Sequence, residues 1–551
     1  MTFTSVNKTF EAAFKKNWER PAISNYQGVT LKFGDVARRM EKLHIMFEEC
    51  GLQKGDKVAI CSRNQANWAV AFLATMTYGG VPVPLLHEFK SSNIHHLVNH
   101  SEAKILFVDD VIWEGLSETE MPDLHAIIQV NTFKLLYAKD ENITQAREHL
   151  NELFGRKYPN AFTANDLNYY EDQPDELAII NYTSGTSGFS KGVMIPYRAV
   201  ASNLEFGRTV LPGLDNTKNV VSMLPSAHMY GLMFELLYEL SVGAHVHFLS
   251  RVPSPKIIMQ ALVDVKPYII IAVPLVIEKI YKTKVKPILE KEGIKVLMKL
   301  PVLNQVVMNK IKTELVNAFG GEFYEVIIGG AAFNKEVEAF FKKMGFPFTV
   351  GYGMTECAPI ITYDDWQVEK LYSCGKAAPN MEVRIASADP VNIPGEIQVK
   401  GANVFLGYYK NEEATAEVFT EDGWFRTGDM GVMDEEGSLF IKGRTKCMIL
   451  GPSGQNIYPE EVETVINSQP YVVDSLVVED NGGLTALIYP NFQQGAKDGM
   501  NQDAFIKYME GTLADLNKEL PNYAKLKKIE VMSEDFERTP KKSIKRYLYQ
   551  R

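Results

Sequence analysis

The first part of the chain alternates between helical and strand periodicity, and this alternation constrains the fold more than any other feature. Val36, Met40, Leu43 and Phe47 recur at spacings of four, three and four, which predicts one apolar helix face that stops at Gly51. Strands are predicted at Lys57–Cys61, Val81–Leu85 and Ile105–Val108, with helices at 67–78 and between the last two strands. This order is typical of parallel sheets covered by helices, an α/β fold.

The length and a change of composition predict two domains. At 551 residues the chain is too long for one ordinary core. After Gly443 two short strands (472–479 and 484–490) and two helical patterns (459–467 and 503–520) fill about a hundred residues, a common size for a small domain. The predicted boundary gives an N-terminal domain of residues 1–444 and a C-terminal domain of residues 445–551.

Composition excludes several classes of protein. A net charge of −10 argues against nucleic-acid binding and against a strongly anionic membrane surface as a partner. No signal peptide is recognised, and the most apolar run, Tyr268–Ile277, contains Pro274 and is too short to span a membrane. It is interpreted as a buried strand that enters a loop. The five cysteines have neither zinc-site nor disulfide spacing, which predicts a reduced, cytoplasmic setting.

A helical segment at 281–318 is rich in lysine. A solvated helix face is the simpler interpretation, and a docking surface for acidic phosphates or membrane headgroups is the alternative. The lysines are Lys282, Lys284, Lys286, Lys291, Lys295, Lys299, Lys310 and Lys312.

The strongest local signal is a hydroxyl-rich loop at 182–192, with the sequence Tyr-Thr-Ser-Gly-Thr-Ser-Gly-Phe-Ser-Lys-Gly. It follows an apolar strand at 177–180, and its glycines allow backbone amides to turn towards an anion, while five hydroxyls and one ammonium add donors for phosphate oxygens. The predicted nucleotide-binding residues of this loop are Thr183, Ser184, Gly185, Thr186, Ser187, Gly188 and Lys191.

This loop differs from a Walker motif, because Lys191 lies between Ser190 and Gly192 instead of between Gly and Ser or Thr. The hydroxyl that would hold magnesium is missing from its usual place. A carboxylate from elsewhere in the chain is therefore required.

Four later blocks complete a family pattern: 351–356 (Gly-Tyr-Gly-Met-Thr-Glu), 423–429 (Gly-Trp-Phe-Arg-Thr-Gly-Asp), 442–444 (Lys-Gly-Arg) and 454–463. With the loop, they resemble the adenylate-forming superfamily of acyl-CoA synthetases, peptide-synthetase adenylation domains and luciferases. Around 274–281 the chain is similar to long-chain fatty acyl-CoA synthetases in particular. The resemblance implies a large N-terminal domain of parallel-rich sheets covered by helices, with a β-barrel-like subdomain, and a small mobile α+β C-terminal domain.

The resemblance also implies roles for individual residues in binding ATP. Tyr352 stacks on adenine, next to Gly353, with Gly330 and Ala331 allowing close approach. Thr355 bonds the α-phosphate and acts with Lys191 in catalysis. Asp429 accepts both ribose hydroxyls, and Arg444 reaches the ribose or a phosphate.

Glu356 supplies the missing carboxylate for Mg²⁺, with Thr183 as a second ligand. Glu356 also occupies the third glycine position of a dinucleotide fingerprint that begins at Gly351, so that motif fails. His228 matches the position beside the acyl carboxylate. His95, His96 and His100 are interpreted as the polar side of a helix and not as a metal site.

In this family the small domain rotates between two half-reactions, which implies a hinge at Lys446 and a thioester channel lined by Gly454. One departure stands out. The usual catalytic lysine of the C-terminal Gly-Lys aligns with Ser543, so Lys542 is taken as its substitute, with Lys541 and Lys545 as further candidates and a solvated basic tail as the alternative.

The predicted function is ATP-dependent activation of a carboxylic acid, a medium- or long-chain fatty acid, as an acyl-adenylate, followed by transfer to coenzyme A. No carboxylate occurs between Val221 and Phe234, near His228, which disfavours an amino-acid substrate. Two alternatives remain: an acyl-AMP ligase that loads a separate carrier protein, and a nucleotide-binding relative with impaired catalysis. Acyl length, a homodimer and transient membrane contact stay open.

Overall fold

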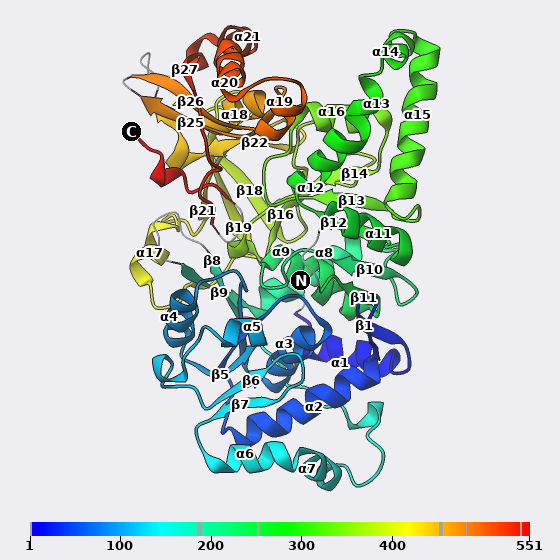
Figure 1. Cartoon of the computed structure of the whole chain (residues 1–551). Helices are drawn as coiled ribbons and strands as arrows, with labels where there is room; N and C mark the ends of the chain where they lie inside the picture. The colour runs from blue at the N-terminus through cyan, green and yellow to red at the C-terminus, as the bar shows by residue number, and fades with distance from the viewer. Residues whose placement is uncertain (1–2, 184–189, 251–253, 451–455, 481, 540–542) are drawn as a thin grey trace.

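The computed structural model describes residues 3–183, 190–250, 254–450, 456–480, 482–539 and 543–551. Parallel and antiparallel sheets with covering helices confirm the α/β class. Residues 33–157 lie at one end of the molecule and residues 459–531 at the other, with the remaining sheets between them (Figure 1).

The N-terminal sheet follows the predicted alternation closely. Its strand order is β4 (Val81–Leu85), β3 (Lys57–Cys61), β5 (Ala103–Val108), β6 (Ala126–Gln129) and β7 (Leu135–Ala138). All neighbours are parallel except β6 and β7. The helices of this part are α2 (Phe33–Glu49), α3 (Ala66–Tyr78), α4 (Ser91–Ser101), α5 (Asp110–Trp113), α6 (Glu141–Glu148) and α7 (Leu150–Lys157). The predicted strands and helices are therefore confirmed here.

Two further sheets are mainly parallel. One has the order β10 (Asn219–Ser222), β11 (His245–Phe248), β1 (Pro21–Asn25) and β2 (Thr30–Lys32), and the other β12 (Ile269–Ala272), β13 (Glu325–Ile328) and β14 (Phe348–Val350). The prediction that the run 268–277 ends in a loop is wrong, because α12 (Pro274–Ile280) begins there. Proline is favoured in the first helical turn, where its missing N–H costs no hydrogen bond.

Three further sheets are antiparallel. They are β20 (Gly407–Tyr408), β9 (Lys191–Pro196) and β8 (Leu177–Thr183); β15 (Tyr352–Gly353), β16 (Ile360–Tyr363) and β17 (Lys376–Ala377); and β18 (Met381–Ala386), β19 (Gly395–Gly401), β21 (Phe425–Met433) and β22 (Leu439–Arg444). Several of the predicted site residues lie on these strands or at their ends.

The lysine-rich segment is helical, as predicted. After a π-helical turn (Tyr281–Val285) come α13 (Lys286–Leu289), α14 (Glu292–Met298) and α15 (Pro301–Ala318). Helices α14 and α15 extend to the same end of the molecule as the C-terminal part, on the opposite side of the view from the strands of that part (Figure 1). Over the described ranges, no helix combines the length and the apolar character needed to cross a bilayer.

The C-terminal part has its own sheet and core. Strands β25 (Val472–Asp480), β26 (Gly483–Pro490) and β27 (Leu526–Val531) pack with α18 (Pro459–Asn467), α20 (Gln502–Gly511) and α21 (Leu513–Glu519). The predicted helix at 503–520 is thus two helices. The core cluster begins at Ile457 and contains no buried residue from the large domain. The boundary at 444–445 stays a prediction.

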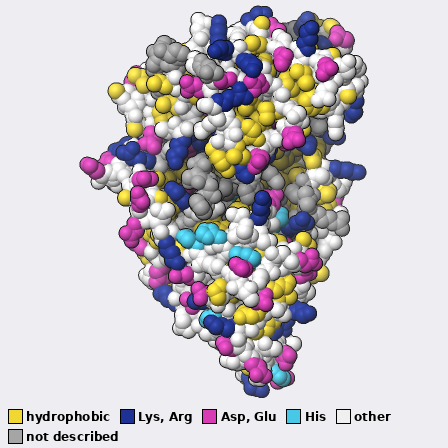
Figure 2. Space-filling model, turned by 60° about the vertical axis from the view of Figure 1, so that its left-hand side comes forward, with side chains coloured by type: hydrophobic (Ala, Val, Ile, Leu, Met, Phe, Trp, Pro, Cys, Tyr) yellow, Lys and Arg dark blue, Asp and Glu magenta, His cyan; other side chains and the backbone are white. Residues whose placement is uncertain are grey.

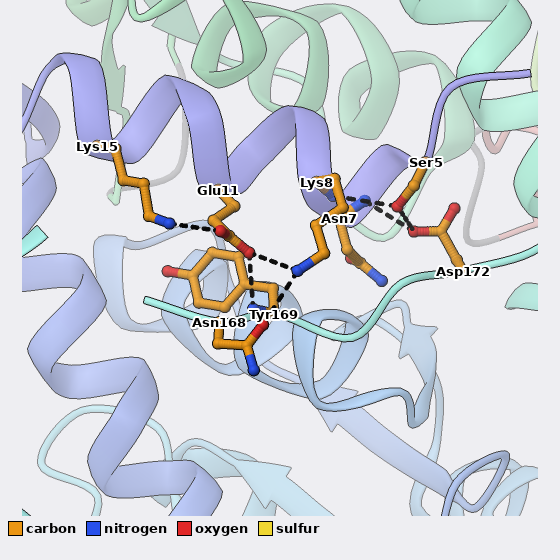
Figure 3. A network of polar contacts seen from close by, with 8 residues as sticks. All are labelled: Ser5, Asn7, Lys8, Glu11, Lys15, Asn168, Tyr169 and Asp172. Carbon is orange, nitrogen blue, oxygen red and sulfur yellow. Dashed lines mark hydrogen bonds and ion pairs between the residues drawn. The ribbon is translucent and has the colours of Figure 1, made fainter. Parts of the chain in front are cut away.

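A buried acid fixes the first helix to the rest of the large domain. The carboxylate of Asp172 accepts hydrogen bonds from Ser5 Oγ at 2.6 Å, Val6 N at 2.9 Å and Asn7 N at 2.8 Å (Figure 3). These donors lie at the start of α1 (Val6–Lys16), whose first N–H groups have no partner within the helix. Asp172 therefore caps a helix that is distant from it in the sequence.

Glu239, on α10 (Tyr238–Val242), is a fully buried acid with an unusual titration. Neither of its carboxyl oxygens has a hydrogen-bond partner within the described part of the chain, and burial raises its pKa to about 8. Between the ordinary pKa near 4.5 and pH 8, the folded protein keeps a proton that the unfolded chain has lost, so stability falls as pH rises through this range.

We expect Glu239→Gln to remove this loss. At pH 9 the variant should be more stable than the original protein by about 5 kcal/mol, and at pH 4 the two should be nearly equal. Acids that do not interact with Glu239 titrate identically in both proteins, so the difference between the two thermal unfolding midpoints reports Glu239 together with Glu235, whose pKa the charge of Glu239 also raises. A constant difference across pH 4–9 would contradict the assignment.

Candidate active site

Strands β8 and β9 hold the two ends of the hydroxyl-rich loop together. Thr183 pairs with Lys191 in the antiparallel register, and Thr183 Oγ1 donates to the Lys191 carbonyl at 3.5 Å. The two ends of the loop are therefore neighbours, as they must be if both are to bind the same nucleotide. The predicted residues Ser184, Gly185, Thr186, Ser187 and Gly188 lie outside the described residues.

A cluster of three side chains joins the loop to the predicted metal carboxylate. Lys191 Nζ lies 4.6 Å from the ring centroid of Tyr408, and Tyr408 donates its hydroxyl to Glu356 Oε1 at 3.0 Å. Glu356 is buried in a short 3₁₀ helix (Thr355–Cys357), together with Thr355. The prediction did not include Tyr408, which reaches this cluster because β20 pairs with β9. No local pattern distinguishes that tyrosine.

A second cluster joins the predicted adenine and ribose residues. Tyr352 donates its hydroxyl to Asp429 Oδ2 at 2.7 Å, and Arg444 Nε lies 3.4 Å from Asp429 Oδ1. Asp429 on β21 faces Arg444 on β22 in the antiparallel register. Burial raises the pKa of the Asp429 carboxyl, while Arg444 acts to lower it. Burial, followed by the charge of Asp429, raises the pKa of the Tyr352 hydroxyl far above its ordinary range, so it remains a donor.

The glycines near Tyr352 serve different purposes. A Cβ on Gly353 would lie 2.2 Å from the Pro359 carbonyl oxygen, so the close approach of the chain to itself already requires glycine there. Gly330 follows β13 with φ +86°, and both it and Ala331 are exposed, with space around Gly330. This turn leaves room for a ligand.

Three polar side chains hold the loop that carries His228; Asn181 and Glu235 are buried, and Asn64 is half-buried. Asn181, on the strand that leads to Thr183, donates Nδ2 to the Ala227 carbonyl at 3.0 Å. Asn64 accepts from Ser226 N at 2.7 Å. These bonds connect the predicted acyl site to the strand before the phosphate loop.

The third of these side chains is Glu235. It lies directly after the range Val221 to Phe234, in which the sequence contains no carboxylate. Its Oε2 accepts from Ser222 Oγ at 3.2 Å, Met223 N at 3.1 Å and Leu224 N at 2.9 Å. The side chain is fully buried, and burial raises its pKa well above the ordinary value. His228 begins α9 (Met229–Leu232), and its Nδ1 accepts from Tyr230 N at 3.5 Å. Neither Asn64, Asn181 nor Glu235 was predicted, because their pairing depends on the fold.

The remaining predicted residues lie at the start and end of the C-terminal part. Lys446 is exposed in a 3₁₀ turn (Thr445–Cys447) directly after β22. Gly454, Lys541 and Lys542 lie outside the described residues. Ser543 is exposed, and its carbonyl accepts from Thr539 N at 2.8 Å. Lys545 forms an ion pair with Glu537 at 3.1 Å.

The helix with three histidines has ordinary polar contacts. His100 Nδ1 and the Tyr182 hydroxyl are 2.7 Å apart, and His95 Nε2 accepts from Ser117 N at 3.1 Å. No group of three or more His, Cys, Asp or Glu side chains in the described ranges could hold a metal ion. A single carboxylate such as Glu356 still fits Mg²⁺ bound to a nucleotide, since this ion keeps several waters and phosphate oxygens as ligands.

The match to a known family is extensive. Residues 10–409 match the family described as AMP-binding enzyme, and residues 448–551 match the AMP-binding enzyme C-terminal domain. The chain belongs to the AMP-binding enzyme family.

Three curated relatives of this AMP-binding enzyme share one kind of name. Long-chain-fatty-acid–CoA ligase FadD15 of Mycobacterium bovis is 26% identical over 90% of this chain and 86% of its own length. Long-chain-fatty-acid–CoA ligase ACSBG2 of Homo sapiens is 26% identical over 86% of this chain and 73% of its own. The Escherichia coli long-chain-fatty-acid–CoA ligase is 27% identical over 86% of this chain and 83% of its own.

Solved structures share the fold across the whole chain. ATP-bound MatB from Rhodopseudomonas palustris has a TM-score of 0.78 at 23% identity, covering 99% of this chain and 98% of its own. O-succinylbenzoate coenzyme A synthetase (MenE) from Bacillus subtilis, in complex with ATP and magnesium ion, has a TM-score of 0.75 at 23% identity, covering 98% of each chain. Both likenesses support a large N-terminal and a small C-terminal domain.

We expect Glu235→Ala to disturb the predicted acyl site of this AMP-binding enzyme more than its predicted nucleotide site. The change leaves two buried backbone N–H groups without a partner, at about 1–3 kcal/mol each, so the His228 loop should shift. The KM for the acid should rise about tenfold, a cost of about 1.4 kcal/mol, while the KM for ATP changes little. Steady-state kinetics with each substrate varied measures both.

Glu235→Gln is the matched control. Its amide oxygen can accept the same hydrogen bonds, and its neutral side chain resembles the protonated acid that burial favours. It should keep the acid KM near the original value. Equal rises in the two KM values for Glu235→Ala would show a general structural defect instead of a positioning role.

Proposed function

We propose that the protein is an AMP-forming acid–thiol ligase that converts a fatty acid of medium or long chain to its coenzyme A thioester. The observation that carries this proposal is the Lys191–Tyr408–Glu356 cluster, which joins the hydroxyl-rich loop to a buried carboxylate. Long-chain-fatty-acid–CoA ligases among the curated relatives support the substrate class.

In the first step a carboxylate oxygen of the acid attacks the α-phosphorus of ATP. The bond from that phosphorus to the bridging oxygen breaks, and pyrophosphate leaves. Lys191 and the loop donors would bind the leaving phosphates, and Thr355 the α-phosphate. Mg²⁺, held by Glu356 and Thr183, would supply positive charge to the phosphate oxygens. Asp429, Arg444 and Tyr352 would hold the nucleoside.

In the second step the thiol sulfur of coenzyme A attacks the acyl carbon of the adenylate. The thiol proton is lost to solvent, and AMP leaves with the bonding electrons. His228 would lie beside the acyl carbonyl, and Gly454 would line the path of the thiol. Lys542 would bridge carboxylate and α-phosphate in the first step only, which requires the C-terminal domain to rotate about Lys446 between the steps.

An AMP-release assay with coenzyme A and a series of saturated acids of increasing length tests the proposal. We expect release that depends on both acid and coenzyme A, with the highest kcat/KM at medium or long chain length. Acid-dependent pyrophosphate exchange without thioester would favour the carrier-protein alternative. If no acid-dependent pyrophosphate exchange is found, the protein is a nucleotide-binding relative without ligase activity.

A cytoplasmic location belongs to the same proposal. All five cysteines are unpaired thiols, as expected in a reducing compartment.

The oligomeric state is a separate question. Size-exclusion chromatography with light scattering distinguishes a monomer from a homodimer.

A further inference from the structure

The hairpin of α14 and α15 exposes aliphatic side chains that a soluble surface would normally bury or replace. The inner side of α15 is buried, with Met308, Ile311 and Leu315 in the core cluster. On the outer side the exposed fractions are 60% for Val296, 47% for Leu300, 40% for Leu303 and 60% for Val306. An amphipathic surface helix carries polar residues on its outer face, so apolar residues on both faces of α15 indicate a partner.

These aliphatic residues are close together on the hairpin. Leu303 and Val306 are three residues apart on α15, so they share one helix face, and Lys310 is seven residues after Leu303 on the same face. Val296 and Leu300 are four residues apart, at the end of α14 and in the turn before α15. Helices α14 and α15 are in contact, and in Figure 1 they extend to one end of the molecule.

Lysines surround this apolar surface. Residues 291–310 contain four lysines and one acid, Glu292, for a net charge of +3 in a chain whose net charge is −10. Lys291, Lys295, Lys299 and Lys310 are all exposed. Lys295 pairs with Glu292 at 3.0 Å, and no acidic group of the described chain lies within ion-pair distance of the other three.

The excess of basic over acidic side chains is a local property of the hairpin. On the face drawn in Figure 2, basic and acidic side chains are interspersed over short distances. Because the Debye length is about 8 Å at physiological ionic strength, a partner at the hairpin would respond to these lysines and little to the distant acids. The overall negative charge therefore does not prevent an anionic partner from binding here.

We propose that the hairpin tip patch, formed by Val296, Leu300, Leu303, Val306, Lys295, Lys299 and Lys310, docks on the surface of an anionic lipid bilayer. The aliphatic side chains enter the boundary between headgroups and acyl chains, while the lysines remain at the depth of the lipid phosphates. A protein partner would need a groove matched to these side chains, whereas a bilayer accepts them in any arrangement.

This proposal goes beyond the catalysed reaction and does not depend on it. Docking would hold the enzyme at a lipid surface whether or not its substrate is a fatty acid. Its test therefore measures binding and not turnover.

Co-sedimentation with vesicles tests the proposal on the full chain. Vesicles of phosphatidylcholine alone are compared with vesicles that contain 30 mol% phosphatidylglycerol at low and physiological salt. The protein should bind the anionic vesicles at least tenfold more strongly than the neutral ones. Replacing Lys295, Lys299 and Lys310 with Gln should weaken binding by roughly fivefold for each lysine.

A second variant and a matched control separate the two parts of the patch. Replacing Leu300, Leu303 and Val306 with Ser should also lower binding to anionic vesicles at least tenfold, because the apolar contribution is lost. The control replaces three exposed lysines elsewhere, Lys139, Lys497 and Lys507, with Gln, which makes the same change in net charge. It should bind within a factor of two of the original protein.

Several outcomes would overturn the proposal. Equal loss in the patch lysine variant and in the control would mean that total charge, and not this surface, governs binding. Unchanged binding of the serine variant would remove the insertion of aliphatic side chains. No binding to either vesicle would reject a lipid partner and direct attention to an acidic protein surface. Circular dichroism and thermal unfolding confirm that each variant is folded.

Discussion

Glu356→Ala is expected to lower acid-dependent pyrophosphate exchange by about 10²- to 10³-fold, because it removes the buried carboxylate that faces the phosphate end of the site. Without it, Mg²⁺ on the triphosphate would lose its proposed carboxylate ligand and keep only Thr183 from the protein, and the leaving pyrophosphate would lose charge stabilisation. The measurement is exchange of labelled pyrophosphate into ATP at saturating acid, as a function of Mg²⁺ concentration. The variant should require a higher Mg²⁺ concentration for half-maximal rate.

Tyr408→Phe is the control for this prediction. It keeps the aromatic ring beside Lys191 and removes only the hydroxyl that donates to Glu356 Oε1. Because one hydrogen bond to a charged group contributes about 1.5–3 kcal/mol, the loss should be roughly 10- to 100-fold and smaller than that of Glu356→Ala. An exchange rate for Glu356→Ala close to the original would end the assignment of this carboxylate to the metal.

Lys446→Pro should separate the two half-reactions. Proline fixes φ near −65° and removes the backbone N–H, so it restricts rotation in the turn between β22 and the C-terminal domain. We expect thioester formation to fall by at least about 100-fold, while pyrophosphate exchange stays within about threefold. Both rates are measured on the same preparation, with the same acid.

Lys446→Ala is the matched variant for the hinge. It removes the exposed side chain and leaves the backbone free to rotate, so thioester formation should be affected far less than in Lys446→Pro. Equal loss of the two half-reactions in Lys446→Pro would argue against a hinge at this residue. A proline effect reproduced by alanine would assign the role to the side chain instead.

Much of the secondary structure follows from local pattern. The strands at Lys57–Cys61 and Val81–Leu85 were predicted with their observed bounds, as was the helix at Pro459–Asn467. The apolar periodicity and the flanking turn residues that predict these elements lie within a few positions of them in the sequence. The predicted loop at Pro274 is wrong for the same reason, because a proline after an apolar strand permits both a loop and a helix start.

The candidate site likewise contains residues that the sequence predicts and residues that only the tertiary structure brings to it. The sequence and its family resemblance predict the chemistry: the hydroxyl-rich loop, the carboxylate that it lacks, and the blocks around Tyr352, Asp429 and Arg444. Only the tertiary structure revealed Tyr408, Asn64, Asn181 and Glu235 as the groups that hold these parts in place. Tyr408 is 52 residues from Glu356, and Asn64 is 162 residues from Ser226. Residues that bind a ligand recur at recognisable spacings because the geometry of the ligand fixes their positions. The residues that support them depend on which segments the fold brings into contact, and these segments are far apart in the sequence.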